Sequence, residues 1–202
     1  GGGLDIRWLR DLFSESDSIT YEQLAAEAEL VEPGSGGLTF IPHFAGRVLP
    51  NNPYVKGSFI GLNWNQKRGH LYRAVMEGIS YEYRFYLQVL RQLYKDHEFG
   101  EMWAVGGGAR SPLFLKIKAG VLGTDIVSLQ TGDTALIGSA VIAGVGTGIF
   151  EDYREPVLST RKVQRRVEPE MKYKELYREQ TETYLHLIEA VSEVYKRKER
   201  GI

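Results

Sequence analysis

Three consecutive glycines, Gly106–Gly108, separate a short apolar run from a predicted helix, and their surroundings suit ligand binding. Glycine has no Cβ, so the backbone can adopt positive φ angles and a ligand can approach the main chain closely. Ser111 and Pro112 follow, a hydroxyl residue suited to the N-cap and a proline suited to the first helical position. Free N–H groups and the helix dipole favour an anion there. The pattern predicts a cradle for nucleotide phosphates, with a plain chain turn as the alternative.

The two commonest nucleotide-binding motifs do not fit this turn. A dinucleotide fingerprint would use Gly106 and Gly108, but Ser111 stands at its third glycine position. That fingerprint also needs an acidic residue about 20 positions further on, where Asp125 comes early and Asp133 comes late. A P-loop needs a lysine followed by serine or threonine after its last glycine, and the sequence has none there. An NAD-binding oxidoreductase domain therefore remains only as a weaker alternative.

Composition limits the class of protein and its partners. A chain of 202 residues is long enough for one large domain with a sizeable core. Its formal net charge of −1 gives no electrostatic reason to expect nucleic acid or an anionic membrane as a partner. The absence of cysteine excludes disulfides and thiolate zinc sites, and it suits a cytoplasmic protein. No apolar run approaches the roughly 20 residues of a membrane-spanning helix.

The elements around the turn alternate between strand and helix, which predicts an α/β domain. Residues 102–105 predict a strand, followed by a helix after Ser111, a second strand and a further helix that ends near Phe150. The remaining helices are predicted from apolar residues at 3.6-residue spacing, and the remaining strands from short apolar runs. These helices lie at about 4–13, 18–30, 67–96 and 170–198, with strands at 38–41 and 57–62 and a basic strand or loop at 157–167.

The predicted helix at 67–96 contains a glycine and an ion pair. Gly78 inside a helix costs about 1 kcal/mol relative to alanine, so we expect another backbone to pack closely against it. Arg73 and Glu77 lie one helical turn apart and are predicted to pair, either on the surface or in an architectural role.

A second glycine run, Gly1–Gly3, precedes the helix at 4–13. Two such turns could face each other across one nucleotide; the alternatives are a plain turn or a tag remnant. The helix that follows is predicted to place Asp5, Arg7, Arg10 and Asp11 on its outer face. Because the chain opens on glycine, we expect a fragment of a longer protein.

Two stretches in order resemble the FGGY family of carbohydrate kinases. GSFIGL at 57–62, a seven-residue gap and HLYRAVME at 70–77 resemble the second signature of that family. GGGARSPLFLKIKAGVLGTDI and GDTALIGSAVIAGVGTGIF resemble its C-terminal nucleotide-binding half, and GGLDIRWLRD resembles the segment where that half begins its adenosine contacts. The resemblance runs over about residues 2–153. The segments GGGARSP and FIPHFAGRVLP are most similar to the corresponding segments of xylulose kinases.

The resemblance implies an α/β, actin-like and ribonuclease-H-like ATPase domain, in which helices pack on a mixed sheet. Residues 1–202 would form the C-terminal nucleotide-binding domain, with 154–202 a basic connection and C-terminal helix. In the family the N-terminal domain carries most sugar contacts and the catalytic aspartate. We expect that domain to be absent here, so no catalytic or metal-ligating residue is assigned. The expected partners are that domain and the sugar, and a homodimer is left open.

The resemblance implies ATP and Mg²⁺ as cofactors and assigns residues to the nucleotide. These cofactor-binding residues are Gly3, Arg7, Gly106, Gly107, Gly108 and Ser111. Gly107 matches a glycine whose main chain approaches the phosphates, and its two neighbours shape the turn. Ser111 stands where some relatives have an asparagine that contacts adenine, and Arg7 stands where glycerol kinases have a glutamine. Gly3 matches a glycine near the nucleotide.

The function that the resemblance implies is transfer of the γ-phosphate of ATP to a sugar or polyol hydroxyl. Xylulose or a related pentulose is the expected acceptor, and the isolated chain is predicted to be inactive. The alternative is a non-catalytic, actin-like module for nucleotide sensing or protein interaction.

Overall fold

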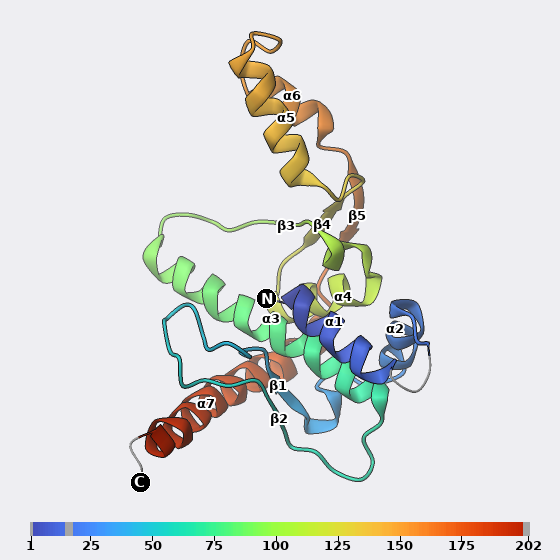
Figure 1. Cartoon of the computed structure of the whole chain (residues 1–202), viewed down its shortest axis with the longest axis vertical. Helices are drawn as coiled ribbons and strands as arrows, with labels where there is room; N and C mark the ends of the chain where they lie inside the picture. Colours follow the sequence, from blue (N-terminus) through green and yellow to red (C-terminus); the bar gives the residue numbers. More distant parts are fainter. Residues whose placement is uncertain (1, 15–17, 200–202) are drawn as a thin grey trace.

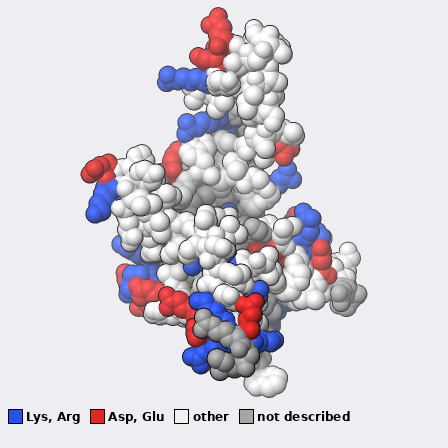
Figure 2. Space-filling model, turned by 60° about the vertical axis from the view of Figure 1, so that its left-hand side comes forward, with Lys and Arg blue, Asp and Glu red and all other residues white. Residues whose placement is uncertain are grey.

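The computed structural model describes residues 2–14 and 18–199. Figure 1 shows a body of helices at one end, a small sheet next to it, and a helical lobe that projects beyond the sheet. Figure 2 shows acidic and basic side chains mixed around a broad uncharged centre of one face. Within the described residues, no helix is long and apolar enough to cross a membrane.

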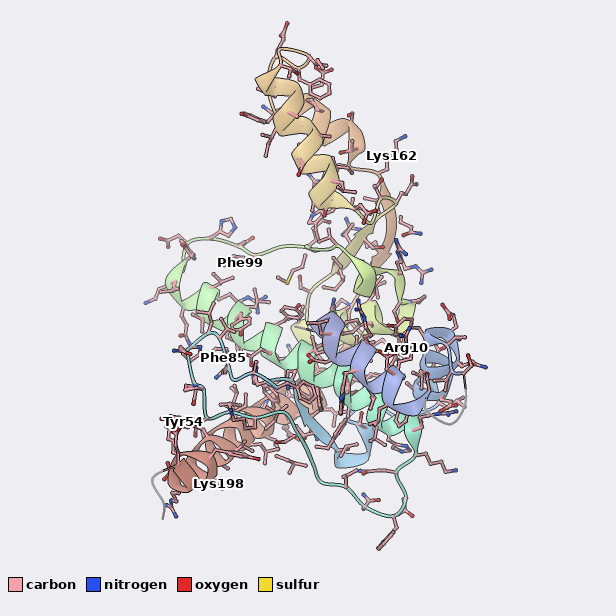
Figure 3. All side chains as sticks on the ribbon, in the orientation of Figure 1. Arg10, Tyr54, Phe85, Phe99, Lys162 and Lys198 are labelled. Atoms are coloured by element: carbon pink, nitrogen blue, oxygen red, sulfur yellow. The ribbon has the colours of Figure 1, made fainter. Side chains whose placement is uncertain are left out.

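The body is built around one long helix, α3 (Arg68–Leu93). Every residue from Tyr72 to Glu82 is buried, because neighbouring elements cover this helix on several sides. Figure 3 shows side chains filling the space around it. The helices packed against α3 are α1 (Gly2–Phe13), α2 (Tyr21–Glu29), α4 (Pro112–Leu122) and α7 (Lys174–Glu199).

The start of α2 is fixed by a capping box. Thr20 Oγ1 accepts a hydrogen bond from the backbone N–H of Gln23 at 3.2 Å. The Gln23 side chain in turn accepts one from the backbone N–H of Thr20 at 2.9 Å. Two N–H groups that the helix leaves unpaired are satisfied in this way.

A short antiparallel ribbon lies against α3. It consists of β1 (Thr39–Ile41) and β2 (Ser58–Ile60), with Phe40 opposite Phe59. A Cβ on Gly78 would overlap with the carbonyl oxygen of Phe40 and lie 3.0 Å from its carbonyl carbon. The prediction that another backbone packs closely on Gly78 is therefore confirmed.

Arg73 and Glu77 form a buried ion pair. The prediction of a surface pair is therefore wrong, and the prediction of an architectural role is confirmed. Arg73 Nε donates to Glu77 Oε1 at 2.8 Å, and the two residues are 6% and 1% exposed. The Glu77 carboxylate also accepts from the backbone N–H of Gly34 at 3.0 Å and from Ser35 Oγ at 2.8 Å. The pair therefore ties α3 to the loop before β1, where Ser35 opens the 3₁₀ helix η1 (Ser35–Gly37).

The second sheet is mixed and three-stranded. Strand β3 (Met102–Ala104) runs parallel to β4 (Ile126–Leu129), and β4 pairs antiparallel with β5 (Val163–Val167). The helix α4 connects β3 to β4 and packs between this sheet and α3. The strand–helix–strand order around the glycine turn is thus confirmed.

The projecting lobe consists of α5 (Thr134–Gly146) and α6 (Arg154–Thr160), which pack on each other. Lys162, labelled in Figure 3, lies where the chain returns from α6 to β5. Helix α5 exposes large apolar side chains, with Leu136 at 69% and Ile142 at 64%.

One expectation for this region was wrong. Residues 157–160, predicted as strand or loop, continue α6, whose start is stabilised by the Asp152 carboxylate accepting from the N–H groups of Arg154 and Glu155. Helix α5 begins at Thr134 with Asp133 at its N-cap position, and the Asp133 side chain makes no capping hydrogen bond. Beyond β5, the final helix is confirmed: a 3₁₀ turn, η3 (Met171–Tyr173), leads into α7.

Candidate nucleotide-binding site

The predicted glycine turn follows β3 directly and leads through the 3₁₀ helix η2 (Gly107–Arg110) into α4. Gly106 has φ +78°, a conformation that other residues adopt only with strain. A Cβ on Gly106 or Gly107 would meet no atom within 4 Å. At Gly107, neither packing nor backbone conformation requires glycine, so its main chain lies open to a ligand.

The start of α4 is as predicted, with Ser111 at the N-cap and Pro112 at the first helical position. Ser111 Oγ accepts a hydrogen bond from the backbone N–H of Phe114 at 3.3 Å. The first turn of an 11-residue helix therefore begins immediately behind the open glycines. Its dipole favours an anion in front of the turn.

A pocket of about 290 Å³ lies on one side of the turn. It is lined by Val105, Gly106 and Arg110 from the turn and by Gln130 and Gly132 from the loop after β4. The carboxyl ends of the parallel strands β3 and β4 meet here, which is the usual place for ligands in α/β sheets. Among the described residues that line the pocket, only Arg110 carries a charge.

The structure brings four of the six predicted site residues together: Gly106, Gly107, Gly108 and Ser111. Gly3 and Arg7 lie on α1, outside the pocket. These two residues and the glycine turn are connected through α3. A Cβ on Gly2 would lie 2.9 Å from Ile79 of α3. One helical turn further along α3, Tyr83 neighbours α4. The start of α1 and the helix that follows the glycine turn therefore both pack on α3, about one helical turn apart.

The prediction of a second glycine turn is wrong for Gly2 and Gly3. Gly2 and Gly3 form the first turn of α1, while Gly1 lies outside the described residues. A Cβ on Gly3 would point into open space, and Gly2 lies against Ile79. Close packing on α3, which is not visible in the local sequence, accounts for the glycine at position 2 but not for the one at position 3.

Sequence reasoning missed Asp5, which it placed on the outer face of α1. The side chain is buried, 5% exposed, and its Oδ2 atom has no hydrogen-bond partner among the described residues. The loop after β1 lies against α1, with the rings of Phe44 and Trp8 4.8 Å apart and His43 near Asp5. Burial raises the pKa of Asp5 to about 6, although the nearby His43 opposes this shift.

We expect Asp5→Asn to stabilise the protein at neutral pH by about 3 kcal/mol, because the pKa of Asp5 is raised from 3.8 to about 6 and each unit corresponds to roughly 1.4 kcal/mol. Because the folded-state pKa of Asp5 is raised, its contribution to stability is present below pH about 4 and lost as the pH rises through about 6. The gain of the variant should therefore be near zero at pH 4 and constant above pH 6. Urea unfolding of both proteins across this range measures it, and a gain that does not change with pH would contradict the assignment.

Comparison with known proteins agrees with this architecture. A sequence model of the FGGY family of carbohydrate kinases, C-terminal domain, matches residues 3–147. The chain belongs to the FGGY family of carbohydrate kinases. The resemblance of the glycine turn and of the segments before and after it is thereby confirmed.

Individual FGGY relatives are similar over most of the chain. The xylulose kinase of Staphylococcus epidermidis is 30% identical over 190 residues, which cover 94% of this chain and 37% of that protein. The glycerol kinase of Dechloromonas aromatica is 32% identical over 176 residues, 84% of this chain and 33% of that protein. The chain therefore spans well under half the length of these relatives.

Solved FGGY structures share the fold. The crystal structure of xylulose kinase from Rhodospirillum rubrum superposes with a TM-score of 0.81 at 26% identity, covering 96% of this chain and 39% of that one. The predicted actin-like ATPase fold, with helices packed on a mixed sheet, is confirmed.

FGGY kinases use ATP, generally with Mg²⁺. The described residues suit the phosphates of ATP better than they suit the metal ion. The open glycines before α4 suit a phosphate. For the metal, the described residues contain no group of three or more histidine, aspartate or glutamate side chains that could hold an ion. Mg²⁺ often needs only one or two carboxylates besides phosphates and water, so its ligands are not assigned to this chain.

Proposed function

We propose that this chain is the ATP-binding half of a sugar kinase that phosphorylates a hydroxyl of a sugar or polyol. The observation that carries the proposal is the Gly106–Gly107 main chain, which is open to solvent directly before α4 in an FGGY C-terminal domain. Xylulose or a related pentulose is the acceptor that we favour. In its support, the segments GGGARSP at 106–112 and FIPHFAGRVLP at 40–50 are most similar to those of xylulose kinases.

The chain's own contribution would be binding and orientation. Backbone N–H groups of the turn and of the first turn of α4 would hold the phosphates, and Ser111, together with Gly3 and Arg7 on α1, would lie along the adenosine. ATP supplies the phosphoryl group when bound. Positioning and charge stabilisation do most of the catalytic work in such transfers.

The base that takes the proton of the sugar hydroxyl would come from an N-terminal domain outside this chain. We therefore expect the 202-residue chain to bind nucleotide but not to phosphorylate sugars. Incubation with ATP and a panel of pentuloses tests this, and turnover above that of a mock purification would contradict it.

Calorimetric titration with ATP and with NAD tests the proposal itself. Saturable binding of ATP is expected, with NAD silent. Binding of NAD alone would favour the oxidoreductase alternative. Binding of ATP by a full-length protein that turns over no sugar would instead favour a non-catalytic, nucleotide-sensing module.

We expect Gly107→Val to weaken ADP binding by roughly tenfold or more, because its side chain would occupy the space through which phosphate reaches the main chain. The melting temperature should change little, since a Cβ there meets no atom within 4 Å. Gly100→Val is the matched control, because Gly100 also faces open space but lies before β3. Unfolding of Gly107→Val, or ADP affinity equal to that of the control, would refute a ligand-binding role for this glycine.

A further inference from the structure

Lys118 lies on the second turn of α4, and its side chain runs back toward the start of that helix. Its Nζ is 4.1 Å from the ring centroid of Phe114 and 5.6 Å from that of Tyr83 on α3. The same Nζ lies 3.8 Å from the position that a Cβ on Gly108 would occupy. The ammonium group is therefore held between two aromatic rings, directly beneath the glycine turn.

This ammonium group has no counter-ion among the described residues. It contacts the faces of the two rings, whereas Lys116, two positions earlier, pairs with Glu170 at 2.7 Å. Burial without a compensating negative charge lowers the pKa of Lys118 to about 8. A half-buried cation of this kind is stabilised by any anion that comes within reach.

We propose that Lys118 contacts a phosphate group of the nucleotide bound at Gly106–Gly108. The inference rests on the proposed ATP site and adds a side-chain cation to its backbone donors. Lys118, the open glycines and the start of α4 all lie at one end of the same helix. The phosphates are the only negatively charged part of a nucleotide. They are therefore the part that can supply the counter-ion that Lys118 lacks.

The start of α1 supports this placement. Gly2 packs on Ile79, and Tyr83, one turn further along α3, neighbours Lys118. A nucleotide lying between α1 and the glycine turn would therefore pass over the ammonium group. The competing explanation is that Lys118 only packs its charge against two rings, a cation–π contact that contributes to folding.

Calorimetry with ADP and adenosine separates these explanations in the variants Lys118→Gln and Lys116→Gln. A charge-assisted hydrogen bond to phosphate predicts that Lys118→Gln binds ADP roughly tenfold more weakly or worse, with adenosine affinity unchanged. Lys116→Gln should match the wild type with both ligands. Equal ADP affinity in the two variants, or an equal loss of adenosine affinity in Lys118→Gln, would overturn the proposal.

The outcomes also distinguish this inference from the function on which it rests. If the wild type binds neither ligand, both proposals fail. If the wild type binds ADP and Lys118→Gln binds it equally well, only the role of Lys118 fails.

A measurement on the wild-type chain covers the case in which Lys118→Gln does not fold. Lysines are labelled with an amine-reactive acetylating reagent, and the modified sites are quantified by mass spectrometry. We expect saturating ADP, but not adenosine, to protect Lys118, while Lys116 serves as an internal reference. Labelling of Lys118 that is unchanged by ADP would overturn the proposal.

Discussion

A free energy of unfolding lower by about 3–5 kcal/mol is expected for Arg73→Met, because the variant leaves a buried carboxylate without its counter-ion. Glu77 is 1% exposed and would keep only its neutral partners in the η1 loop and on α7. Arg73 also donates to the carbonyl of Ala28 at 3.3 Å and to the Tyr177 hydroxyl at 3.3 Å, so its loss affects two further elements.

The effect should depend on pH. Burial raises the pKa of Glu77, and Arg73 opposes that shift. Removing Arg73 raises the folded-state pKa further, so the deficit of the variant should be small near the unfolded-state value of about 4.5 and grow as the pH rises above it. Chemical denaturation at pH 5 and pH 7.5 measures this difference.

Arg178→Met is the matched control. Arg178 pairs with Glu175 and Glu182, both at 2.7 Å, but its side chain on α7 is 45% exposed. Exposed pairs contribute at most about 1 kcal/mol. A loss of similar size in the two variants would show that the buried pair does not have the architectural role assigned to it.

Gly78→Ala is expected to destabilise the fold by about 3 kcal/mol, at the upper end of typical overpacking. Alanine would gain about 1 kcal/mol in helix propensity, but its Cβ would overlap with the carbonyl oxygen of Phe40. Phe40 cannot move away easily, because it is 1% exposed and paired with Phe59 across the ribbon.

Thermal and urea unfolding of Gly78→Ala measure the loss. Gly3→Ala serves as the control, since Gly3 is also helical but a Cβ there meets no atom within 4 Å. The control should change stability by no more than about 1 kcal/mol. A Gly78→Ala protein as stable as the wild type would mean that α3 and β1 are less tightly packed than they are in this structure.

The features that could be predicted from the sequence depend on residues close together in the chain. The turn at Gly106, the N-cap at Ser111 and the capping box at Thr20 are determined by neighbours within a few positions. The same holds for Gly78, because glycine in a strongly periodic helix needs a packing reason.

The features that were missed depend on distant contacts. Glu77 is buried partly by Tyr177, 100 residues further along the chain. Asp5 is buried on the side of α1 where the loop with His43 and Phe44 approaches, which helical periodicity alone cannot indicate. Lys118 has the same residue type as Lys116 and lies on the same helix, and only the packing of α3 against α4 distinguishes them.

The α5–α6 lobe implies that different parts of this chain open with different free energies of unfolding. Its two helices pack mainly on each other, and large apolar side chains such as Leu136 and Ile142 remain exposed. Local opening of the lobe therefore disrupts little of the core around α3 and costs less free energy than global unfolding. Backbone amides of α5 would exchange their hydrogens through that local opening, whereas those of the buried stretch of α3 would exchange only when the whole body unfolds.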